Sequence, residues 1–562
     1  MNKKWEYNSI DTNKINEISK KYNISNLLST ILVNKNIIED EEVRLFLNPT
    51  RNDFHDPFNM PDMDAVVDRI LKAMEMNEKT IIYGDYDVDG ITSITVLKRF
   101  FKEHGFVVDC YIPNRLNEGY GLNRDAITSI AKEGYKLIIT VDCGISANEE
   151  IDLANNLGME VIVTDHHEPL EKLPNAIGIV DCKRKDSKYP FNSLAGVGVS
   201  FKLIQAISMR KKLDDKDYLK YLDVVAVGTI SDIVPLVDEN RVIAKLGLKL
   251  LEVTKKPYLK VLLDVSGYKE INSNTVSFGI APRINASGRM GFEQDALELF
   301  LTDNIVKTRE IAEKLNSYNR KRQEIEKNIF NEAIEIIEKN ELDKKDIIII
   351  GSKNWHHGVI GIVASKITDL YYKPCILVCF EDDVGKGSGR SIPGFDLHSA
   401  LCEVSDCLDK YGGHEMAIGL SIKKEKFELF KTKMESIASK QNLSSFLPVI
   451  KIDMEINQKD VTIDNVKSLS LLEPYGESNN VPIFEYKNLK IDAIRTLLEG
   501  KHLKMILKDG NMTIDAIAFN MGSYINDFHL GDKINVVGTL EINRFGNREN
   551  IQFNLKDMKK SY

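Results

Sequence analysis

Short apolar runs alternate with amphipathic stretches over much of the first half of the chain. The apolar runs have the length of buried strands and lie at residues 80–83, 107–112, 137–141, 161–164 and 177–180. Between them, apolar side chains recur with the 3.6-residue period of a helix at residues 91–101, 124–133 and 147–157. Strands that alternate with helices predict a parallel, doubly wound α/β domain, which we place at residues 76–294.

The pattern changes outside this domain. Residues 1–75 are mixed and mostly polar, and we treat them as an N-terminal extension. Residues 295–342 have the charged periodicity of a long connecting helix, which we interpret as solvated. Residues 343–447 predict a second, smaller α/β domain that begins with the apolar run 346–351. Residues 448–562 are rich in short β-type runs and predict a small OB-type β-barrel, although a β-sandwich gives a similar pattern.

The composition narrows the class of protein. The chain has 562 residues, 43% of them hydrophobic, and a net charge of −9, so any contact with nucleic acid must come from a local site and not from overall charge. There is no apolar run long enough to span a membrane and no signal-peptide core. The seven cysteines form no CxxC pair, which favours reduced thiols in a cytoplasmic protein.

Acidic and histidine side chains gather where three of the predicted strands end. They are Asp85, Asp87 and Asp89 after the first strand, Asp142 after a second, and Asp165, His166 and His167 after a third. In a parallel α/β sheet, ligands bind outside the carboxyl ends of the strands. We therefore expect these side chains to meet at one edge of the sheet.

The types of these residues favour metal chemistry. Asp85, Asp87 and Asp89 alternate by two, which would place them on one face of an extended backbone. Crowded carboxylates raise one another's pKa, and divalent cations remove that penalty. Oxygen and imidazole ligands suit Mn²⁺ or Mg²⁺. The sequence thus predicts a phosphoesterase centre for two divalent cations, Mn²⁺ or Mg²⁺.

Two further acids lie in one apolar stretch. Asp232 follows a Gly-Thr pair at the boundary of a helix or turn, and we include it among the metal ligands. For Asp223 we favour a helix cap over a metal role. Asp142 by itself would also fit a helix cap. A metal site is favoured because acids follow three strands in succession.

The ordered motifs identify a family. The segments DYDVDG, VDCG, DHH and VGTISDIVPL occur at residues 85–90, 141–144, 165–167 and 227–236. In this order they resemble the four motifs of the DHH phosphoesterase superfamily, and most closely its RecJ branch of single-stranded-DNA-specific exonucleases. Supporting segments are APRINASGRMG, WHHGVIGIVASKI, GKGSGRS and YGGHEMAIGL, at residues 281–291, 355–367, 385–391 and 411–420. The second α/β domain would then be of the DHHA1 type.

The resemblance implies a metal-dependent enzyme that degrades single-stranded DNA from the 5′ end to mononucleotides, in DNA repair and recombination. It assigns the two metals to Asp85, Asp87, Asp89, Asp142, His166 and Asp232. Asp142 would bridge the ions. Asp165 and His167 would complete the catalytic set as supporting or phosphate-binding groups.

The resemblance also implies a pocket for the 5′-phosphate. Arg115, Arg289 and Arg390 are the candidates, since the planar guanidinium binds phosphate oxygens bidentately. Ser388 would assist Arg390, and the neighbouring Gly387 and Gly389 would offer a nest of backbone N–H groups.

A second phosphate site is expected at Gly412, Gly413 and His414, where two glycines permit close approach of the backbone. In the predicted barrel, Phe519, Phe545 and Phe553 are candidates for base stacking, although most aromatic side chains of small barrels lie in the core.

Two other functions stay open. The chain could hydrolyse short oligoribonucleotides or cyclic dinucleotides, but such substrates need no strand-holding barrel. It could also be a scaffold without metal, but its set of acids is complete.

As partners we expect single-stranded DNA with a 5′ end, a single-strand binding protein and a helicase. We expect a monomer that does not bind a membrane.

Overall fold

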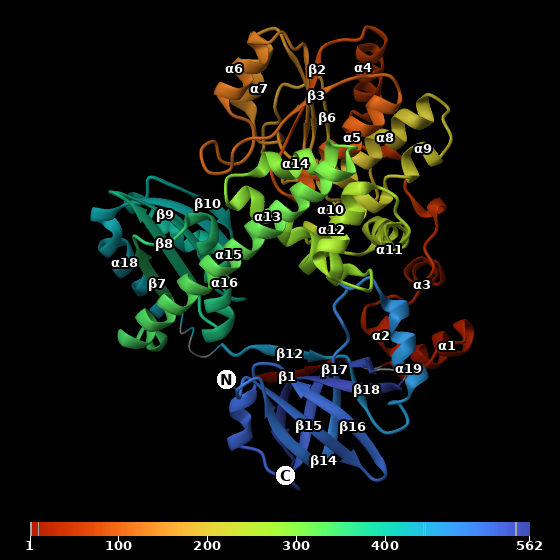
Figure 1. The fold of residues 1–562 in the computed structure, drawn as a ribbon, viewed down its shortest axis with the longest axis vertical. Coiled ribbons are helices and arrows are strands. Elements are labelled where there is room, and N and C mark those ends of the chain that lie inside the picture. Colours follow the sequence, from red (N-terminus) through yellow and green to blue (C-terminus); the bar gives the residue numbers. More distant parts are fainter. Residues whose placement is uncertain (1–2, 9–10, 442, 444–445, 546–547, 562) are drawn as a thin grey trace.

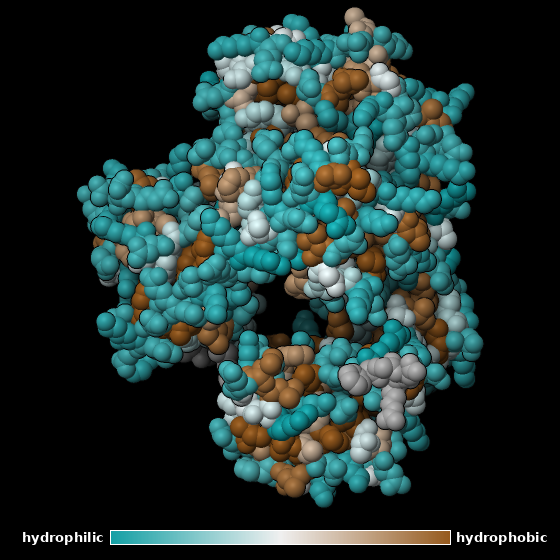
Figure 2. Space-filling view, in the orientation of Figure 1, coloured by the Kyte–Doolittle hydropathy of each residue, from teal (hydrophilic) through white to brown (hydrophobic). Residues whose placement is uncertain are grey.

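The computed structural model describes residues 3–8, 11–441, 443, 446–545 and 548–561. A first α/β unit, a second α/β unit and a β-barrel surround an opening that passes through the molecule (Figures 1 and 2). The second unit and the barrel lie on different sides of this opening, and both connect to the first unit. No helix within the described ranges is long and apolar enough to cross a membrane.

The first unit is built on a parallel sheet with the strand order β3-β2-β4-β5-β6. Its strands are β2 (Thr80–Gly84), β3 (Asp109–Tyr111), β4 (Leu137–Val141), β5 (Glu160–Thr164) and β6 (Gly178–Val180). Apolar cores on the two faces contain α4 (Met63–Glu75), α5 (Val88–Glu103) and α8 (Gly196–Arg210) on one side, and α6 (Arg124–Lys132) and α7 (Asn148–Asn156) on the other. The predicted doubly wound parallel sheet is confirmed, because strands covered on both faces are continuously apolar.

A helical layer extends this unit. It contains α9 (Lys216–Leu219), α10 (Leu222–Ser231), α11 (Asp238–Glu252), α12 (Pro257–Ser266), the π-helical turn η3 (Thr275–Ile280), α13 (Ala281–Arg289) and α14 (Glu293–Leu301). Helix α10 is buried along its whole length and packs against α5 and α11. It therefore holds its C-terminal end firmly beside the first turn of α5.

The long helix α15 (Ile305–Lys339) spans 35 residues and joins the two α/β units. Ile311 and Leu315 lie in the core of the first unit, whereas Ile329 and Ile337 lie in that of the second. The position of this connecting helix agrees with the sequence pattern. The expectation that it is simply solvated is wrong, because an apolar stripe along it is buried at both ends.

The second unit contains a mixed sheet with the order β10-β11-β9-β8-β7. The strands are β7 (Ile348–Ser352), β8 (Cys375–Glu381), β9 (Val384–Arg390), β10 (Lys410–His414) and β11 (Ala417–Lys423). Only β7 and β8 pair in parallel. Helix α16 (His357–Tyr371) packs with α15 on one face, and α17 (Leu397–Glu403) and α18 (Phe427–Ser439) on the other.

The C-terminal region is a closed barrel. Its strands are β14 (Phe484–Leu497), β15 (His502–Asp509), β16 (Met512–Ala518), β17 (Lys533–Phe545) and β18 (Arg548–Lys560), and β14 pairs with both β15 and β17. The short strand β13 (Met454–Ile456), helix α19 (Ile463–Ser468) and turn η8 (Leu469–Leu472) lead into it. A sheet that closes on itself confirms the OB-type barrel and excludes the sandwich.

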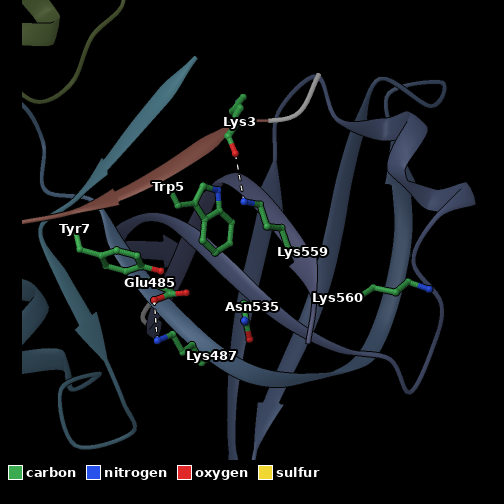
Figure 3. A pocket seen from close by; sticks show the side chains of 8 residues that line it. All are labelled: Lys3, Trp5, Tyr7, Glu485, Lys487, Asn535, Lys559 and Lys560. Carbon is green, nitrogen blue, oxygen red and sulfur yellow. Dashed lines mark hydrogen bonds and ion pairs between the residues drawn. The ribbon is translucent and has the colours of Figure 1, made fainter. Parts of the chain in front are cut away.

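The N-terminal segment packs against this barrel. Strand β1 (Lys4–Tyr7) pairs in parallel with β12 (Val449–Ile452). Helices α1 (Thr12–Tyr22), α2 (Asn26–Asn34) and α3 (Asp40–Leu47) share the apolar core of the barrel. Trp5 and Tyr7 line a cavity of about 660 Å³ on the barrel surface (Figure 3), and Trp5 Nε1 donates to Asp557 at 2.8 Å. This association of the two chain ends had no signal in the local pattern.

Candidate metal centre and phosphate pocket

The three acids after β2 lie at a strand-to-helix turn. Asp87 is the N-cap of α5 and accepts a hydrogen bond from the Gly90 N–H at 3.1 Å, while Asp89 lies in the first turn of the helix. A Cβ at Gly90 would lie 2.3 Å from the carbonyl oxygen of Asp85, so glycine is needed for this turn. The expected extended backbone is therefore wrong, and it is the turn that brings these side chains together.

Helix α8 fixes two of the acids. The N–H groups of Gly196 and Val197, at its N-terminus, donate to the Asp89 carboxylate at 2.6 and 2.8 Å, where the helix dipole favours negative charge. Asp142 follows β4 with a left-handed φ of 59°, a conformation that Asp and Asn tolerate better than most residues. A Cβ at Gly196 would lie 2.7 Å from the Cβ of Asp142, so only glycine permits this contact.

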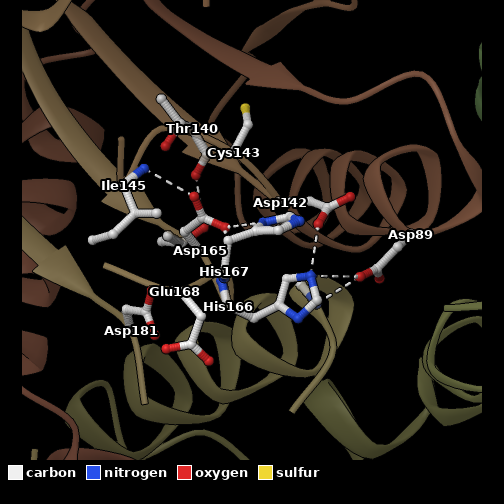
Figure 4. A network of polar contacts seen from close by, with 12 residues as sticks. Asp89, Thr140, Asp142, Cys143, Ile145, Asp165, His166, His167, Glu168 and Asp181 are labelled. Atoms are coloured by element: carbon white, nitrogen blue, oxygen red, sulfur yellow. Dashed lines mark hydrogen bonds and ion pairs between the residues drawn. The ribbon is translucent and has the colours of Figure 1, made fainter. Parts of the chain in front are cut away.

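His166 lies among the carboxylates (Figure 4). Its Nε2 is 3.1 Å from Asp142, 3.7 Å from Asp232 and 3.8 Å from Asp89. Asp232 is the C-cap of α10, at the helix boundary that the sequence predicts. Burial, and next the neighbouring His167, lower the pKa of His166 to about 3. The imidazole is therefore neutral near pH 7 and can offer a lone pair from Nε2.

The donor atoms form overlapping groups, in each of which all atoms lie within 4.8 Å of one another. One group contains Asp89, His166 and Asp232, and another contains Asp85, Asp87 and Asp142. Asp142 also groups with His166 and His167. Asp142 is thus the acid that reaches both halves of the cluster, as a bridging ligand must.

The charges of this cluster fit a pair of hard cations. Burial, assisted by nearby carboxylates, raises the pKa of Asp89 to about 7 and that of Asp232 to about 9. The same causes raise the pKa of Asp142 well above its usual range. Asp85 Oδ1 and His166 Nε2 are buried and find no hydrogen-bond partner among the described residues. Unpartnered oxygen and imidazole donors of this kind suit Mn²⁺ or Mg²⁺.

Asp165 orients His167 beside the cluster. Its carboxylate accepts from His167 Nδ1 at 2.7 Å and from the Ile145 N–H at 2.9 Å. Burial lowers the pKa of His167, but the hydrogen bond and charge of Asp165 outweigh it and raise that pKa overall. Tyr120 donates to the carbonyl oxygen of Asp142 at 3.1 Å and lies 3.1 Å from His167 Nδ1. No sequence signal marked Tyr120, since a tyrosine in a glycine-rich loop has many other roles.

Two further buried acids lie outside these groups. Asp223 accepts from Thr254 at 2.7 Å and from Lys256 at 2.6 Å. The expected helix cap is wrong, because Tyr221 is the N-cap of α10 and Asp223 lies in its first turn. Asp223 instead binds the segment that follows α11. Asp181 follows β6 and was not singled out by the sequence analysis. Burial raises its pKa to about 7, so β6 is a fourth strand that ends in an acid.

The arginines expected to bind phosphate converge between the two α/β units. Arg289, at the end of α13, donates from Nη1 to the carbonyl oxygen of Gly358 in α16 at 2.9 Å. Burial, and next the charges of Arg115, Arg322 and Arg390, lower the pKa of Arg289 to about 10. Several guanidinium groups close enough to act on Arg289 create a strongly positive site for an anion.

Arg322 is the member of this group that the sequence analysis missed. It lies on α15, where it donates to the Asn319 side chain at 2.7 Å and pairs with Glu326. The sequence pattern predicted a solvated charged helix, and in such a helix Arg322 does not differ from the charged residues around it. Only the packing of α15 between the two units places Arg322 near Arg289.

The expected nest at Gly387 and Gly389 is wrong. Strand β9 lies between β8 and β11 and pairs with both, so its backbone N–H groups belong to the sheet. A Cβ at Gly387 would lie 2.7 Å from the side chain of Leu420. These glycines therefore serve packing, because they let the side chains of β11 lie flat against β9.

The remaining phosphate candidates lie on the same sheet. Gly412 is in register with Gly419, which is in register with Ser388, and His414 and Arg390 both face Ala417. A Cβ at Gly412 would meet nothing within 4 Å. Gly413 continues this exposed edge strand. The structure thus brings Ser388, Arg390, Gly412, Gly413 and His414 onto one open strip.

The three phenylalanines considered for base stacking differ in how exposed they are in the barrel. Phe519 is 54% exposed and can stack on a base, whereas Phe553 is buried in the barrel core. Stacking is therefore wrong for Phe553. The side chain of Phe545 lies outside the described residues.

Gly196→Ala is expected to weaken Mn²⁺ binding by about 10- to 100-fold, because a displaced Asp142 no longer reaches both halves of the cluster. The added Cβ would lie 2.8 Å from Asp142 Oδ1. Isothermal titration calorimetry measures the effect. Gly198→Ala on the same helix is the control, since its Cβ would meet only Leu194, at 3.3 Å. Unchanged binding in Gly196→Ala would contradict the assignment of Asp142.

Models of known families match three segments of the chain. The DHH family N-terminal domain matches residues 79–229, the DHHA1 domain residues 344–440 and the RecJ OB domain residues 452–557. The matched segments correspond to the first unit, the second unit and the barrel.

Whole proteins match over nearly the full chain. The single-stranded-DNA-specific exonuclease RecJ of Bacillus subtilis is 38% identical over 560 residues, which cover 99% of this chain and 70% of that protein. The Escherichia coli protein of the same name is 32% identical over 86% of this chain and 88% of its own length. The crystal structure of RecJ with Mn²⁺ from Thermus thermophilus superposes with a TM-score of 0.86 at 27% identity, covering 100% of this chain and 80% of that one. A Mg²⁺ complex of the same protein also matches, with a TM-score of 0.78 at 26% identity and coverage of 100% of this chain and 79% of that one.

Proposed function

Since this chain belongs to the RecJ family of single-stranded-DNA-specific exonucleases, we propose that it degrades single-stranded DNA from the 5′ end to mononucleotides, in DNA repair and recombination. The observation that carries the proposal is the position of Asp142, which lies in two of the three donor groups and 3.1 Å from His166 Nε2, a member of the third. Such an arrangement suits two-metal hydrolysis of a phosphodiester. The relatives whose structures contain Mn²⁺ and Mg²⁺ support the choice of metals.

We propose that Asp85, Asp87, Asp89, Asp142, His166 and Asp232 hold two divalent cations. When bound, these cations supply Lewis acidity toward the phosphodiester and the water that cleaves it. The chain itself supplies the geometry: α8 fixes Asp89, and the turn after β2 fixes Asp85 and Asp87. Ligands fixed before the substrate arrives lower the cost of reaching the transition state.

His167 is proposed to assist from beside the metals. Asp165 holds His167 Nδ1, and its charge favours the imidazolium. The side chain of His167 stays 45% exposed, so its other ring nitrogen can donate a proton to a phosphate oxygen. Removal of Asp165 would leave His167 neutral and free to rotate.

The 5′ end is proposed to lie in the arginine pocket. Arg115, Arg289 and Arg390 would bind the terminal phosphate, with Ser388, Gly412, Gly413 and His414 along the open strip beside it. A strand anchored there places the first internucleotide bond at a fixed distance, which makes the products mononucleotides. A 5′ end without phosphate would lose these charge-assisted contacts.

We further propose that the enzyme works as a monomer in the cytoplasm. Both donor groups and the arginine pocket come from one chain, and all seven cysteines are free thiols. Because the substrate is single-stranded, a strand-separating helicase and a single-strand binding protein would supply it.

End-labelled DNA tests the function. With Mn²⁺, a 5′-labelled single strand is expected to release labelled mononucleotide at once, whereas a 3′-labelled strand shortens in steps. Blunt duplex DNA should stay intact. Release of mononucleotides from dinucleotides alone would favour the short-substrate hydrolase. Strand binding without any turnover would favour the scaffold.

A further inference from the structure

Arg241 is a fully buried cation outside the metal centre and the phosphate pocket. It lies on α11, and its side chain is directed at backbone carbonyl groups of other segments. Nε donates to Phe46 at 2.8 Å, and Nη2 donates to Leu472 and Glu473 at 3.2 and 3.1 Å. The guanidinium also stacks on the Phe46 ring, 3.5 Å from its centroid.

No carboxylate pairs with Arg241 in the part of the chain that the structure describes. A desolvated cation without a counter-charge is costly, and its hydrogen bonds are what offset that cost. Lys245, one turn later on α11, repeats the arrangement and donates to Leu47 at 2.8 Å and to Leu471 at 3.2 Å. Two neighbouring cations thus bind carbonyl groups of the same two segments.

The two segments are the ones that hold the barrel. Phe46 and Leu47 end α3, which shares the apolar core of the barrel. Residues 471–473 end η8 and begin the loop that leads into β14. Phe46, Leu47 and Leu472 all lie in the apolar core of the barrel. Arg241 and Lys245 therefore join two segments that pack with the barrel to the first α/β unit.

The same loop also contacts the segment that carries Asp232. The Leu236 N–H donates to the Glu477 carbonyl oxygen at 2.9 Å. A Cβ at Gly476 would lie 2.6 Å from the Leu236 side chain, so the two segments are in close contact. A cavity of about 940 Å³ lies beside them and is lined by Arg289, Tyr475 and Val481, among others. The loop before β14 thus lines a cavity that also contains Arg289 of the phosphate pocket and Ser231 and Ile233, the two neighbours of Asp232 in the chain.

We propose that Arg241 is a positioning residue, which fixes the barrel relative to the metal centre so that a strand held by the barrel enters that centre in register. The inference rests on the proposed function, because it needs a strand that contacts both parts. Short substrates that end before the barrel do not depend on Arg241. Long strands gain from the barrel only while its distance and orientation are fixed.

A length series of 5′-phosphorylated single strands tests this. Arg241→Met keeps the apolar stem and removes the five donors. It is expected to lower kcat/KM about 10- to 100-fold for strands of about 30 nucleotides. For the shortest strand that the wild type cleaves, kcat/KM should stay within about twofold of wild type. Arg241→Lys, which can still reach one or two carbonyl groups, should recover part of the loss.

Arg99→Met is the matched control. Arg99 also binds a carbonyl group, that of Phe300 at 2.8 Å, and stacks 4.8 Å from the Tyr258 ring centroid, but it lies within the first unit. A change there should affect all strand lengths equally. An equal loss at all lengths in Arg241→Met would overturn the proposal, because it would indicate general destabilisation.

Hydrogen exchange gives a readout that does not depend on activity. In Arg241→Met, the amides of Leu236 and of residues 471–477, apart from Pro474, should exchange faster, while those of β4 stay protected. Unchanged exchange together with an unchanged length profile would refute the role of Arg241. If the wild type cleaves no strand of any length, the proposed function fails, and exchange alone then decides whether Arg241 fixes the barrel.

Discussion

Asp142→Asn is expected to lower turnover on single-stranded DNA by roughly a thousandfold or more. Asp142 lies in two of the three donor groups, and it is 3.1 Å from the Nε2 of His166, which belongs to the third. Its loss should therefore weaken both cation sites at once. Asparagine keeps the size of the side chain and tolerates the left-handed backbone at this position. The loss is therefore chemical and does not come from misfolding. Single-turnover kinetics at saturating Mn²⁺ measure it.

The same substitution is expected to stabilise the metal-free protein. Burial and the neighbouring acids raise the pKa of Asp142 in the folded state, so its charged form opposes folding above the pKa of the unfolded chain, which is about 4. Each unit of that rise corresponds to about 1.4 kcal/mol. The gain should thus be present at neutral pH, shrink as the pH falls toward about 4, and vanish well below that pH, where the carboxyl is protonated in both states.

Thermal unfolding with and without Mn²⁺ separates the two effects. Metal at about 100 times its Kd should stabilise the wild type by about 2.7 kcal/mol for each cation bound, and should stabilise Asp142→Asn much less. Asp152→Asn, on the exposed face of α7, is the control for a lost surface charge. Full activity of Asp142→Asn, or full stabilisation of this variant by Mn²⁺, would exclude a bridging role.

Arg390→Met is expected to reduce the preference for a 5′-phosphate by about 10- to 100-fold. The methionine keeps an apolar side chain of similar length and removes the guanidinium, whose Nη2 lies near Gly361 of α16. The measured quantity is the ratio of kcat/KM for a 5′-phosphorylated strand to that for a 5′-hydroxyl strand. This ratio should fall, while Mn²⁺ binding stays unchanged, because Arg390 lies outside the metal groups.

Lys423→Met is the control for Arg390. Lys423 lies exposed at the far end of the same sheet, on β11, and its loss changes the net charge by the same amount. A ratio that stays constant in Arg390→Met would place the phosphate elsewhere. A ratio that falls equally in both variants would indicate a long-range effect of charge and not a pocket.

The metal centre could be predicted from the sequence because its chemistry lies at strand ends. Runs such as residues 137–141 are apolar throughout, so the acid that follows each of them stands out. The backbone around the first three acids could not be predicted in the same way. The spacing of two residues between these acids suggested an extended strand. In the structure Asp87 is the N-cap of a helix, because its carboxylate binds a free N–H group at the start of that helix.

The predictions that were wrong or missing concern residues whose role depends on contacts with distant parts of the sequence. Gly387 and Gly389 suggested a nest because a glycine pattern does not reveal that β9 pairs on both sides. Arg322 and Tyr120 became candidates only when packing brought them to the site. Arg241 could not be found either, because carbonyl groups that accept its hydrogen bonds leave no mark in the sequence.

The pairing of β1 with β12 has a consequence for how the chain folds during synthesis. At roughly 5–20 residues per second, the ribosome needs on the order of half a minute or more to make the residues between these strands. During that time α1, α2 and α3 have no barrel to cover their apolar faces. The first α/β unit can fold meanwhile, since its strands follow one another closely. Residues 4–47 are thus made before the barrel on which they pack, and until the barrel forms their apolar side chains stay exposed to other chains.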